Sequence, residues 1–537
     1  MHNGLQNQKE QGFSGEKQSF KKMKWGFQLF VFLFFSVWLY WWTQNNPLPD
    51  GYQNEYLHLG TCFDLFDALM RGDVWHLRWY AYTSYWAWGF YIPPWFGMFL
   101  TGKSLTTAIL SNLWYLALLI WSMSQLNALL GQKYSLLLLL FCPAVYGAMT
   151  RFEPNFANIA FMSFGLLGVI KSEGFSHRRW SLLWGLALGV GLMMDRLTLG
   201  FFLIPAMFPI LLSREFWAAR SRIKNVGLGL VTTILLTVAY YREFFIRHSA
   251  ELFSQAPVGE IDSSGTLVVQ ENVLPWLYYP LNLLDSQAGY AIGALMLIGL
   301  IQSVMRRQDK NIQILLSSIL FPLLLFTIIA KKQPYYLMPA LVPLSLLAAY
   351  FSRLSQAAIG FGVIGWLALG LGAFELPRSI FPENWTAPKY VLAKPPSGLD
   401  WKLHELTESL DTEAKEVIVF SEDQLFFEGF VVSALREKLD GHVRGITQDP
   451  VGIWEFQAEA KYFIWVTQEN YQGDDWPKKS QIEIELISDH YELSELPAIS
   501  EAMMKQKENF QKIGEWDKER RKVILFERVN DSKRDGE

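Results

Sequence analysis

Four segments of the chain place acidic and basic side chains beside long apolar stretches. They are 45–60 with Asp50, Glu55 and His58, 149–161 with Arg151 and Glu153, 193–205 with Asp195 and Arg196, and 327–333 with Lys331 and Lys332. Ionisable groups at membrane depth are costly and tend to be functional. Carboxylates can take the proton of a hydroxyl, and fixed cations can stabilise a phosphate. The four segments therefore predict a site that activates a hydroxyl and holds a lipid-linked phosphate.

The elements that must position these residues are long and apolar. The 537 residues are 51% hydrophobic, 15% aromatic and 18% charged, a composition untypical of a soluble protein. A helix needs about 20 apolar residues to cross the hydrocarbon core. Apolar stretches occur at 25–42, 104–130, 134–150, 155–171, 181–194, 197–212, 225–247, 288–305, 312–329, 334–351 and 359–376. We expect an all-α polytopic membrane domain over 25–377 with about eleven spans; 181–194 and 197–212 are short enough to form one re-entrant hairpin.

The basic residues of the short loops predict the orientation, because cytoplasmic loops are enriched in Lys and Arg. Lys21, Lys22 and Lys24 precede the first stretch and predict a cytoplasmic N-terminus. Alternation then places on the far side the segments 43–103, 151–154, 195–196, 248–287, 330–333 and everything after 377. The Lys331–Lys332 doublet falls on the side where positive charge is rare, which points to a bound anion.

The two ends of the chain differ from this apolar part. Residues 1–24 are polar and predict a disordered cytoplasmic segment. Residues 378–537 hold 21 Lys and Arg against 32 Asp and Glu, a net charge of −11. The runs EVIVF (416–420), KYFIWV (461–466) and KVILF (522–526) are separated by polar segments of helical pattern, such as 401–410 and 501–513. This alternation predicts a soluble extracytoplasmic α/β domain.

The order of these segments resembles the GT-C glycosyltransferases that use polyprenyl-phosphate sugars, among them the protein O-mannosyltransferases and the lipid A aminoarabinose transferases. Pro49-Asp50 with Tyr52 is similar to the family's Pro-Asp-Glu motif, Pro93-Pro94 to its Pro-Pro, and Glu153-Pro154 to its acid-Pro pair. AKKQPYYLMPALVPLSLLAAY (330–350) is the most specific match, similar to a Lys…Tyr-hydrophobic-Pro…Pro-Leu segment. GLALGVGLMMDR (185–196) resembles a glycine-rich span that usually ends in Lys. The resemblance covers residues 25–350.

The resemblance implies a transferase that moves a sugar from a polyprenyl-phosphate donor to an extracytoplasmic acceptor with inversion. The residues it implies are Asp50 as base, Glu153 as a second acid that orients the acceptor or shares the base role, and Lys331, Lys332, Arg196 and Arg151 on the donor phosphate, with Tyr52, Glu55 and His58 as accessory candidates. A divalent cation stays open, because Gly51 stands where the family has its second acid. The expected partners are the lipid-linked sugar, a glycan, lipid or protein acceptor and membrane lipids, with no nucleic acid, in a bacterial inner membrane.

The candidates also have structural interpretations. Asp50 could cap the helix that follows it, Glu153 could be an acid favoured at a helix N-terminus, and the lysines could extend toward lipid head groups. Asp195 and Arg196 could pair with each other, His58 could be structural, and the aromatic stretch 75–95 predicts an interfacial anchoring belt. Two other functions stay open, a secondary transporter and a non-catalytic membrane protein that assembles through 378–537. A transporter predicts internal repeats and charges near the midplane, and the sequence shows neither clearly.

Overall fold

The computed structural model describes residues 25–46, 53–83, 87–195, 198–253, 275–328, 333–376, 379–381, 393 and 395–396, together with five strands between 417 and 528. In the helical part, the side chains of 53–57, 81–83, 247–253 and 275 are left out of the description. Outside the described residues lie the N-terminal segment 1–24, the predicted helical segment 401–410, and the candidates Asp50, Tyr52, Arg196, Lys331 and Lys332.

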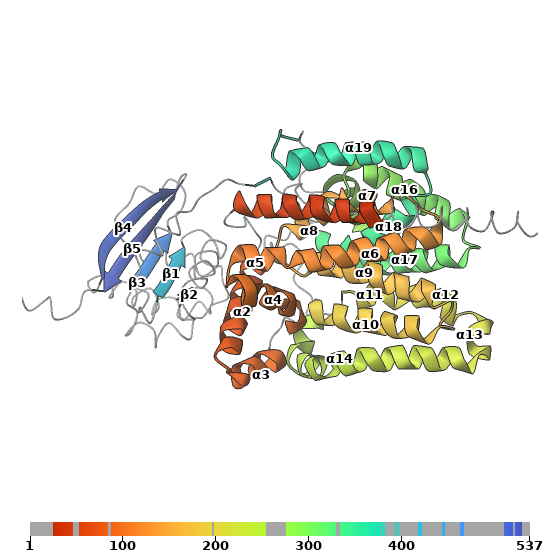
Figure 1. Cartoon of the computed structure of the whole chain (residues 1–537), viewed down its shortest axis with the longest axis horizontal. Helices are drawn as coiled ribbons and strands as arrows, with labels where there is room; N and C mark the ends of the chain where they lie inside the picture. The colour runs from red at the N-terminus through yellow and green to blue at the C-terminus, as the bar shows by residue number, and fades with distance from the viewer. Residues whose placement is uncertain are drawn as a thin grey trace, which may run out of the picture.

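The described chain up to 376 is helical. The first helix is Trp25–Gln44. It is followed by α2 (Gln53–Met70), α3 (Val74–Thr83), η1 (Trp88–Tyr91), α4 (Ile92–Thr101), α5 (Leu105–Leu110), α6 (Asn112–Leu130), α7 (Ser135–Leu140), α8 (Pro143–Met149), α9 (Asn155–Lys171), α10 (Arg178–Met194), α11 (Gly200–Leu203), η2 (Pro205–Met207), α12 (Phe208–Leu211), α13 (Arg214–Ala218), α14 (Arg220–Phe253), α15 (Pro275–Asn282), η3 (Leu283–Gln287), α16 (Tyr290–Met305), α17 (Lys310–Ile328), η4 (Pro334–Ala340), α18 (Leu341–Ala348) and α19 (Ser352–Leu369). The long helices run side by side, with α2, α3 and α4 gathered at one end of the bundle (Figure 1).

The bundle has the composition of a membrane domain. Four described helices are long and apolar enough to cross a membrane, namely Trp25–Gln44, Leu105–Leu130, Arg220–Ile246 and Lys310–Ile328. Shorter apolar helices cover Asn155–Lys171, Gly200–Leu211, Tyr290–Met305 and Pro334–Ala348. The outer face of α14 exposes Val231, Leu235 and Val238. Exposed apolar faces of this kind mark surfaces that lipid or protein must cover.

Prolines divide several of the predicted apolar stretches. The stretch 134–150 is two helices, because Pro143 opens α8 and, lacking an N–H group, cannot continue α7. The stretch 197–212 is likewise split at Pro205, and 334–351 begins as the 3-10 helix η4, which contains Pro339. The helix predicted at 359–376 is shifted toward the N-terminus: α19 begins at Ser352 and ends at Leu369.

Glycines allow α9, α10 and α14 to pack closely. A Cβ at Gly168 of α9 would lie 2.9 Å from the backbone nitrogen of Trp184, and a Cβ at Gly229 of α14 would lie 2.8 Å from the carbonyl oxygen of Ser181. Thr233 of α14 donates a hydrogen bond from Oγ1 to the carbonyl oxygen of Gly185, at 2.9 Å. Small residues that let backbones approach, and hydroxyl groups that bond across helices, are the usual means of association in lipid.

The C-terminal strands form one mixed sheet in the order β2-β1-β3-β5-β4. The strands are β1 (Val417–Ser421), β2 (Val443–Gly445), β3 (Tyr462–Val466), β4 (Phe510–Lys518) and β5 (Arg521–Arg528). β1 pairs in parallel with β2 and β3, whereas β5 pairs antiparallel with β3 and β4. The three predicted strand runs coincide with β1, β3 and β5. The helical prediction for 501–513 is wrong at 510–513, because pairing with β5 draws these residues into β4.

The close approach of α10 and α14 gives a testable prediction. Gly229→Val should destabilise the bundle by about 1–3 kcal/mol, because the added atoms overpack a filled contact. Gly227→Val is the matched control on the same helix, since a Cβ there has nothing within 4 Å. Thermal unfolding of both variants in detergent checks this, and equal melting temperatures would show that the contact is loose.

Candidate functional site

Arg151 and Glu153 lie in a buried loop between α8 and α9. α8 ends at Met149 and α9 begins at Asn155. The two charged residues are only 6% and 4% exposed. Asn112, at the start of α6, fixes this loop: its Nδ2 donates to the carbonyl oxygens of Met149 and Arg151, both at 2.9 Å. Buried carbonyl groups need such partners, so one amide sets the course of the backbone that carries both charges.

Two amides on the first turn of α9 hold two carboxylates. Asn155 donates from Nδ2 to Oε2 of Glu153 at 2.7 Å, and Asn158 donates from Nδ2 to Oδ2 of Asp195 at 2.8 Å. Residues three apart share a helix face, so the amides present neighbouring donors. Asp195 follows the last residue of α10 in an extended conformation. Carboxylates from two different loops are thus gathered at the N-terminal end of one helix, where the helix dipole favours negative charge.

Burial raises the pKa of Glu153 above its usual range. Arg151 and the Asn155 amide act in the opposite direction, whereas the negative charge of Asp195 raises the pKa of Glu153 further. Because desolvation is the largest of these effects, the carboxyl group keeps its proton to a higher pH than an exposed glutamate would. A buried acid with a raised pKa beside a cation is a frequent property of acid–base sites.

The aromatic segment η1 packs against this group. A Cβ at Gly89 would lie 2.5 Å from the carbonyl oxygen of Met193, so the absence of a side chain lets η1 reach the end of α10. The rings of Phe90 and Phe152 lie 4.9 Å apart. Three segments that are distant in sequence, at 88–91, 149–153 and 193–195, therefore meet.

His58 joins the same region through η1. Its Nδ1 lies 2.9 Å from the hydroxyl oxygen of Tyr91, and its ring packs edge-on against Phe90 at 5.6 Å. His58 is buried on α2. Described residues from three of the four charged segments are thus brought together, namely His58, the Arg151–Glu153 pair and Asp195. The tyrosine contact also suits a structural role, and an accessory role for His58 stays a prediction.

The structure describes residues next to the remaining candidates in the chain, but not the side chains of these candidates. Asp50 and Tyr52 lie outside them, just before α2, and Glu55 lies on α2 one turn before His58 without a described side chain. Arg196 is next to Asp195 but outside the described residues, as are Lys331 and Lys332. The chain that follows the lysines is anchored: Gln287 donates from Nε2 to the carbonyl oxygen of Pro334 at 2.6 Å, and η4 contacts α9. Roles for these residues therefore stay predictions.

Sequence reasoning missed the amides and one acid. Asn112, Asn155 and Asn158 are polar residues within apolar stretches, and that contrast was the available signal. Asp285 is buried in η3 and belongs to the segment predicted outside the membrane; a lone acid carries no motif. Among the described residues, no group of three His, Cys, Asp or Glu side chains could hold a metal ion, and a cation bound by Asp50 or Glu55 remains an open prediction.

The chain is similar to known proteins in sequence and in fold. No protein-family model matches the chain. It is 27% identical over 248 residues to the undecaprenyl phosphate-alpha-4-amino-4-deoxy-L-arabinose arabinosyl transferase of Aeromonas salmonicida, which covers 44% of this chain and 42% of that protein. The transferase of the same name from Yersinia pestis is 25% identical over 279 residues, covering 47% and 45%. The match thus spans less than half the length of these relatives.

Solved structures extend the likeness to nearly the whole chain. The crystal structure of ArnT from Cupriavidus metallidurans bound to undecaprenyl phosphate superposes with a TM-score of 0.56 at 13% identity, covering 93% of this chain and 97% of that chain. The same protein in the apo state gives a TM-score of 0.54. The fold is therefore that of an ArnT-like membrane protein, and the two comparisons together confirm the predicted resemblance to GT-C glycosyltransferases that use polyprenyl-phosphate sugars.

Proposed function

We propose that this protein is an integral-membrane glycosyltransferase that moves a sugar from a polyprenyl-phosphate donor to an extracytoplasmic acceptor. The observation that carries the proposal is the group of buried Arg151, buried Glu153 and half-buried Asp195 at the start of α9. Support comes from the fold, which is shared with a protein solved with bound undecaprenyl phosphate. The relatives' names put an undecaprenyl-phosphate-linked amino sugar first among the donors to test. The acceptor class is a lipid, a glycan or a protein.

In the proposed reaction, the acceptor hydroxyl attacks the anomeric carbon of the sugar. The bond between that carbon and the phosphate oxygen breaks, and its electron pair leaves with the phosphate. The hydroxyl proton passes to a carboxylate, because an alcohol is a poor nucleophile near neutral pH. We assign Asp50 as this base and Glu153 as the acid that orients the acceptor or shares the base role. Attack opposite the leaving group inverts the anomeric configuration.

The charge that develops on the leaving phosphate needs fixed cations in a site of low dielectric. We assign this role to Lys331, Lys332, Arg196 and Arg151. Arg151 supports the assignment most directly, since it is buried and acts electrostatically on Glu153. The anchoring of Pro334 by Gln287 limits where the chain just before it can lie.

The same proposal includes the layout of the chain in a bacterial inner membrane. We propose about eleven spans, as expected from the apolar stretches, with a cytoplasmic N-terminus and an extracytoplasmic C-terminal α/β domain. Figure 1 supports the last assignment, because the strands lie beyond the end of the bundle that carries α2 and α3. An impermeant thiol reagent should label a cysteine at position 71, which is exposed in the first predicted outer segment, and not one at position 176, which is exposed on the predicted cytoplasmic side, when it is added from the outer side.

The function is tested with the full-length protein in proteoliposomes, an undecaprenyl-phosphate-linked amino sugar and an extract of envelope acceptors. Asp50→Asn should lower sugar transfer by about 10²–10⁴-fold, the usual cost of losing a general base. Glu173→Gln is the control, since Glu173 is exposed on the loop between α9 and α10. If Asp50→Asn transfers sugar at a near-normal rate and Glu55→Gln loses transfer, the base is Glu55 and the assignment of Asp50 is wrong. A chain that binds acceptor but never transfers sugar would support an assembly role instead.

The raised pKa of Glu153 predicts how sugar transfer depends on pH. Its pKa is raised in the folded protein, so a base role requires transfer to increase as pH increases through that pKa. Glu153→Gln should remove this limb of the pH–rate profile, and Asp195→Asn should shift it to lower pH because a charge that raises the pKa is gone. Stability gained from neutral Glu153 is present below the unfolded pKa and is lost as pH rises through the folded pKa. Glu153→Gln should therefore melt no lower than wild type at pH 8, so that loss of transfer cannot be ascribed to unfolding.

The role assigned to Lys331 and Lys332 predicts that donor affinity falls when both lysines are replaced. Replacing Lys331 and Lys332 together with Gln removes charge-assisted contacts of about 1.5–3 kcal/mol each, so donor binding should weaken at least about tenfold. Arg at both positions should restore part of the binding, because the charge remains while the geometry differs. The matched control is Gln at Arg306 and Arg307, an exposed basic pair at the end of α16. Unchanged donor binding in the Lys331–Lys332 double variant would assign the doublet to lipid head groups.

A further inference from the structure

Basic side chains gather at the end of the bundle opposite α2 and α3. The segments 171–180, 213–224 and 306–310 hold ten Lys and Arg against three Asp and Glu. They connect α9 to α10, form α13 and the start of α14, and connect α16 to α17. Figure 1 shows α13 and the start of α14 at this end. The enrichment of cytoplasmic loops in Lys and Arg accounts for the number of these charges, but not for the place where two of the side chains meet.

Arg222 of α14 and Lys310 of α17 converge on one glycine. A Cβ added at Gly174, in the loop between α9 and α10, would have Nη1 of Arg222 at 3.7 Å and Nζ of Lys310 at 3.8 Å among its nearest atoms. Two side chains of like charge, from different helices, therefore cover the same buried residue. Their mutual repulsion opposes this arrangement, and an anion bound to both of them would offset that cost.

The loop beneath the two cations has an unusual backbone. Glu173, Gly174 and Phe175 all have positive φ angles, of 49°, 69° and 64°, in a region that glutamate and phenylalanine rarely adopt. Asn225, one turn after Arg222 on α14, holds this loop by donating from Nδ2 to the carbonyl oxygen of Phe175 at 2.9 Å. The start of α14 thus fixes the loop and presents Arg222 to it, so the fold itself sets the place where the cations meet.

The acidic residues of these segments leave the two cations available. Oε2 of Glu215 lies 3.9 Å from Nη1 of Arg222, and Glu215 is 78% exposed. This Nη1 is buried and donates no hydrogen bond to a described residue. Glu173 lies 3.4 Å from a histidine of its own loop, and Asp309 accepts a hydrogen bond from the first turn of α17. Lys310 is exposed and forms no ion pair within the described part of the chain.

The starts of α10 and α14 add to the positive potential. The N–H groups of the first turn give a helix a partial positive charge at its N-terminus, so acidic residues are favoured there and basic residues are not. α10 begins with Arg178 and Arg179 and α14 begins with Arg220, and neither helix has an acidic residue in its first turn. Helix dipoles and side chains therefore both favour an anion at this end of the bundle.

Exposed apolar side chains next to the cations favour a lipid as the carrier of this anion. Ile223 follows Arg222 and is 40% exposed, Met305 precedes the segment 306–310 and is 73% exposed, and Trp217 of α13 is 63% exposed. Exposed tryptophans are typical of the interface between membrane and water. A free phosphate would leave this apolar surface uncovered, whereas the acyl chains of a phospholipid would cover it.

We propose that Arg222 and Lys310 bind the phosphodiester group of an anionic phospholipid of the phosphatidylglycerol type. The guanidinium group can donate two parallel hydrogen bonds to phosphate oxygens, and the ammonium group of the lysine acts as a point charge. Basic pockets between membrane helices bind such head groups in other proteins. The proposal is independent of the glycosyltransferase assignment, because the lipid lies at the end of α9 opposite to Glu153.

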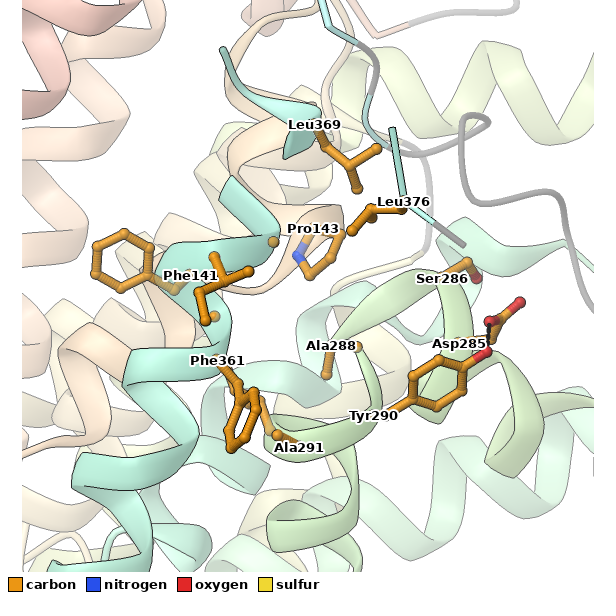
Figure 2. Close-up of a pocket in the computed structure, with 15 residues that line it drawn as sticks. Phe141, Pro143, Asp285, Ser286, Ala288, Tyr290, Ala291, Phe361, Leu369 and Leu376 are labelled. Carbon is orange, nitrogen blue, oxygen red and sulfur yellow. Dashed lines mark hydrogen bonds between the residues drawn. The ribbon is translucent and has the colours of Figure 1, made fainter. Parts of the chain in front are cut away.

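Lipid can also bind elsewhere on the protein, so the quantity to measure is the preference for an anionic head group. A mostly apolar cavity of about 520 Å³ lies between η3, α16 and α19. Figure 2 shows Phe141 and Phe361 among the residues that line it. None of the described residues that line this cavity is Lys or Arg. A lipid bound there would raise the total number of retained lipids without a need for an anionic head group.

The test equilibrates the full-length protein with vesicles of equal phosphatidylglycerol and phosphatidylcholine and counts the retained lipids by native mass spectrometry. Wild type should retain phosphatidylglycerol preferentially. Arg222→Gln combined with Lys310→Gln should reduce this preference at least about tenfold, because two charge-assisted contacts are lost. Lys133→Gln combined with Arg353→Gln is the matched control and should keep the preference, since it removes the same charge from exposed residues of other loops on the same predicted side of the membrane.

The proposal is overturned if wild type retains the two lipids equally, if the Arg222 and Lys310 variant keeps the preference, or if the control variant loses as much of it. Inorganic phosphate is the second probe. If it raises the melting temperature of delipidated wild type as much as phosphatidylglycerol does, the ligand is free phosphate and the lipid is rejected. Should the double variant fail to fold, Lys310→Gln alone decides, because Lys310 is exposed; an unchanged preference then rejects the site.

Discussion

Two amide–carboxylate hydrogen bonds on the first turn of α9 hold the acids of the candidate site in place. Asn155 binds Glu153 and Asn158 binds Asp195. The two acids repel each other, and buried Glu153 also loses hydration, which is costly unless the carboxylate has a hydrogen-bond partner. The amides provide these partners and Arg151 provides the compensating charge. The arrangement keeps the two carboxyl groups near each other, and the raised pKa of Glu153 favours its protonated form.

Close helix packing brings together the segments that form this arrangement. Gly89 lets η1 approach the end of α10, and Gly168 and Gly229 let α9 and α14 approach α10 from either side. Apolar side chains gain little free energy by moving from lipid into a contact between helices. Helix association in a membrane therefore depends on close backbone packing and on hydrogen bonds. A larger side chain at these glycines would separate the helices and draw Asp195 away from Asn158. The geometry of the site is therefore set several turns away from it.

The sequence predicted the helical membrane domain well because apolar runs and their breaks follow from local chemistry. Its errors have local causes too: Pro143 and Pro205 interrupt stretches that hydropathy alone joins, and residues 510–513 take their structure from pairing with β5. At the site, the sequence singled out Arg151, Glu153 and Asp195, which the structure brings together. It marks Asn112 only as a polar residue within an apolar stretch and does not predict its role, because the hydrogen bonds that give Asn112 this role join residues 37 and 39 positions apart.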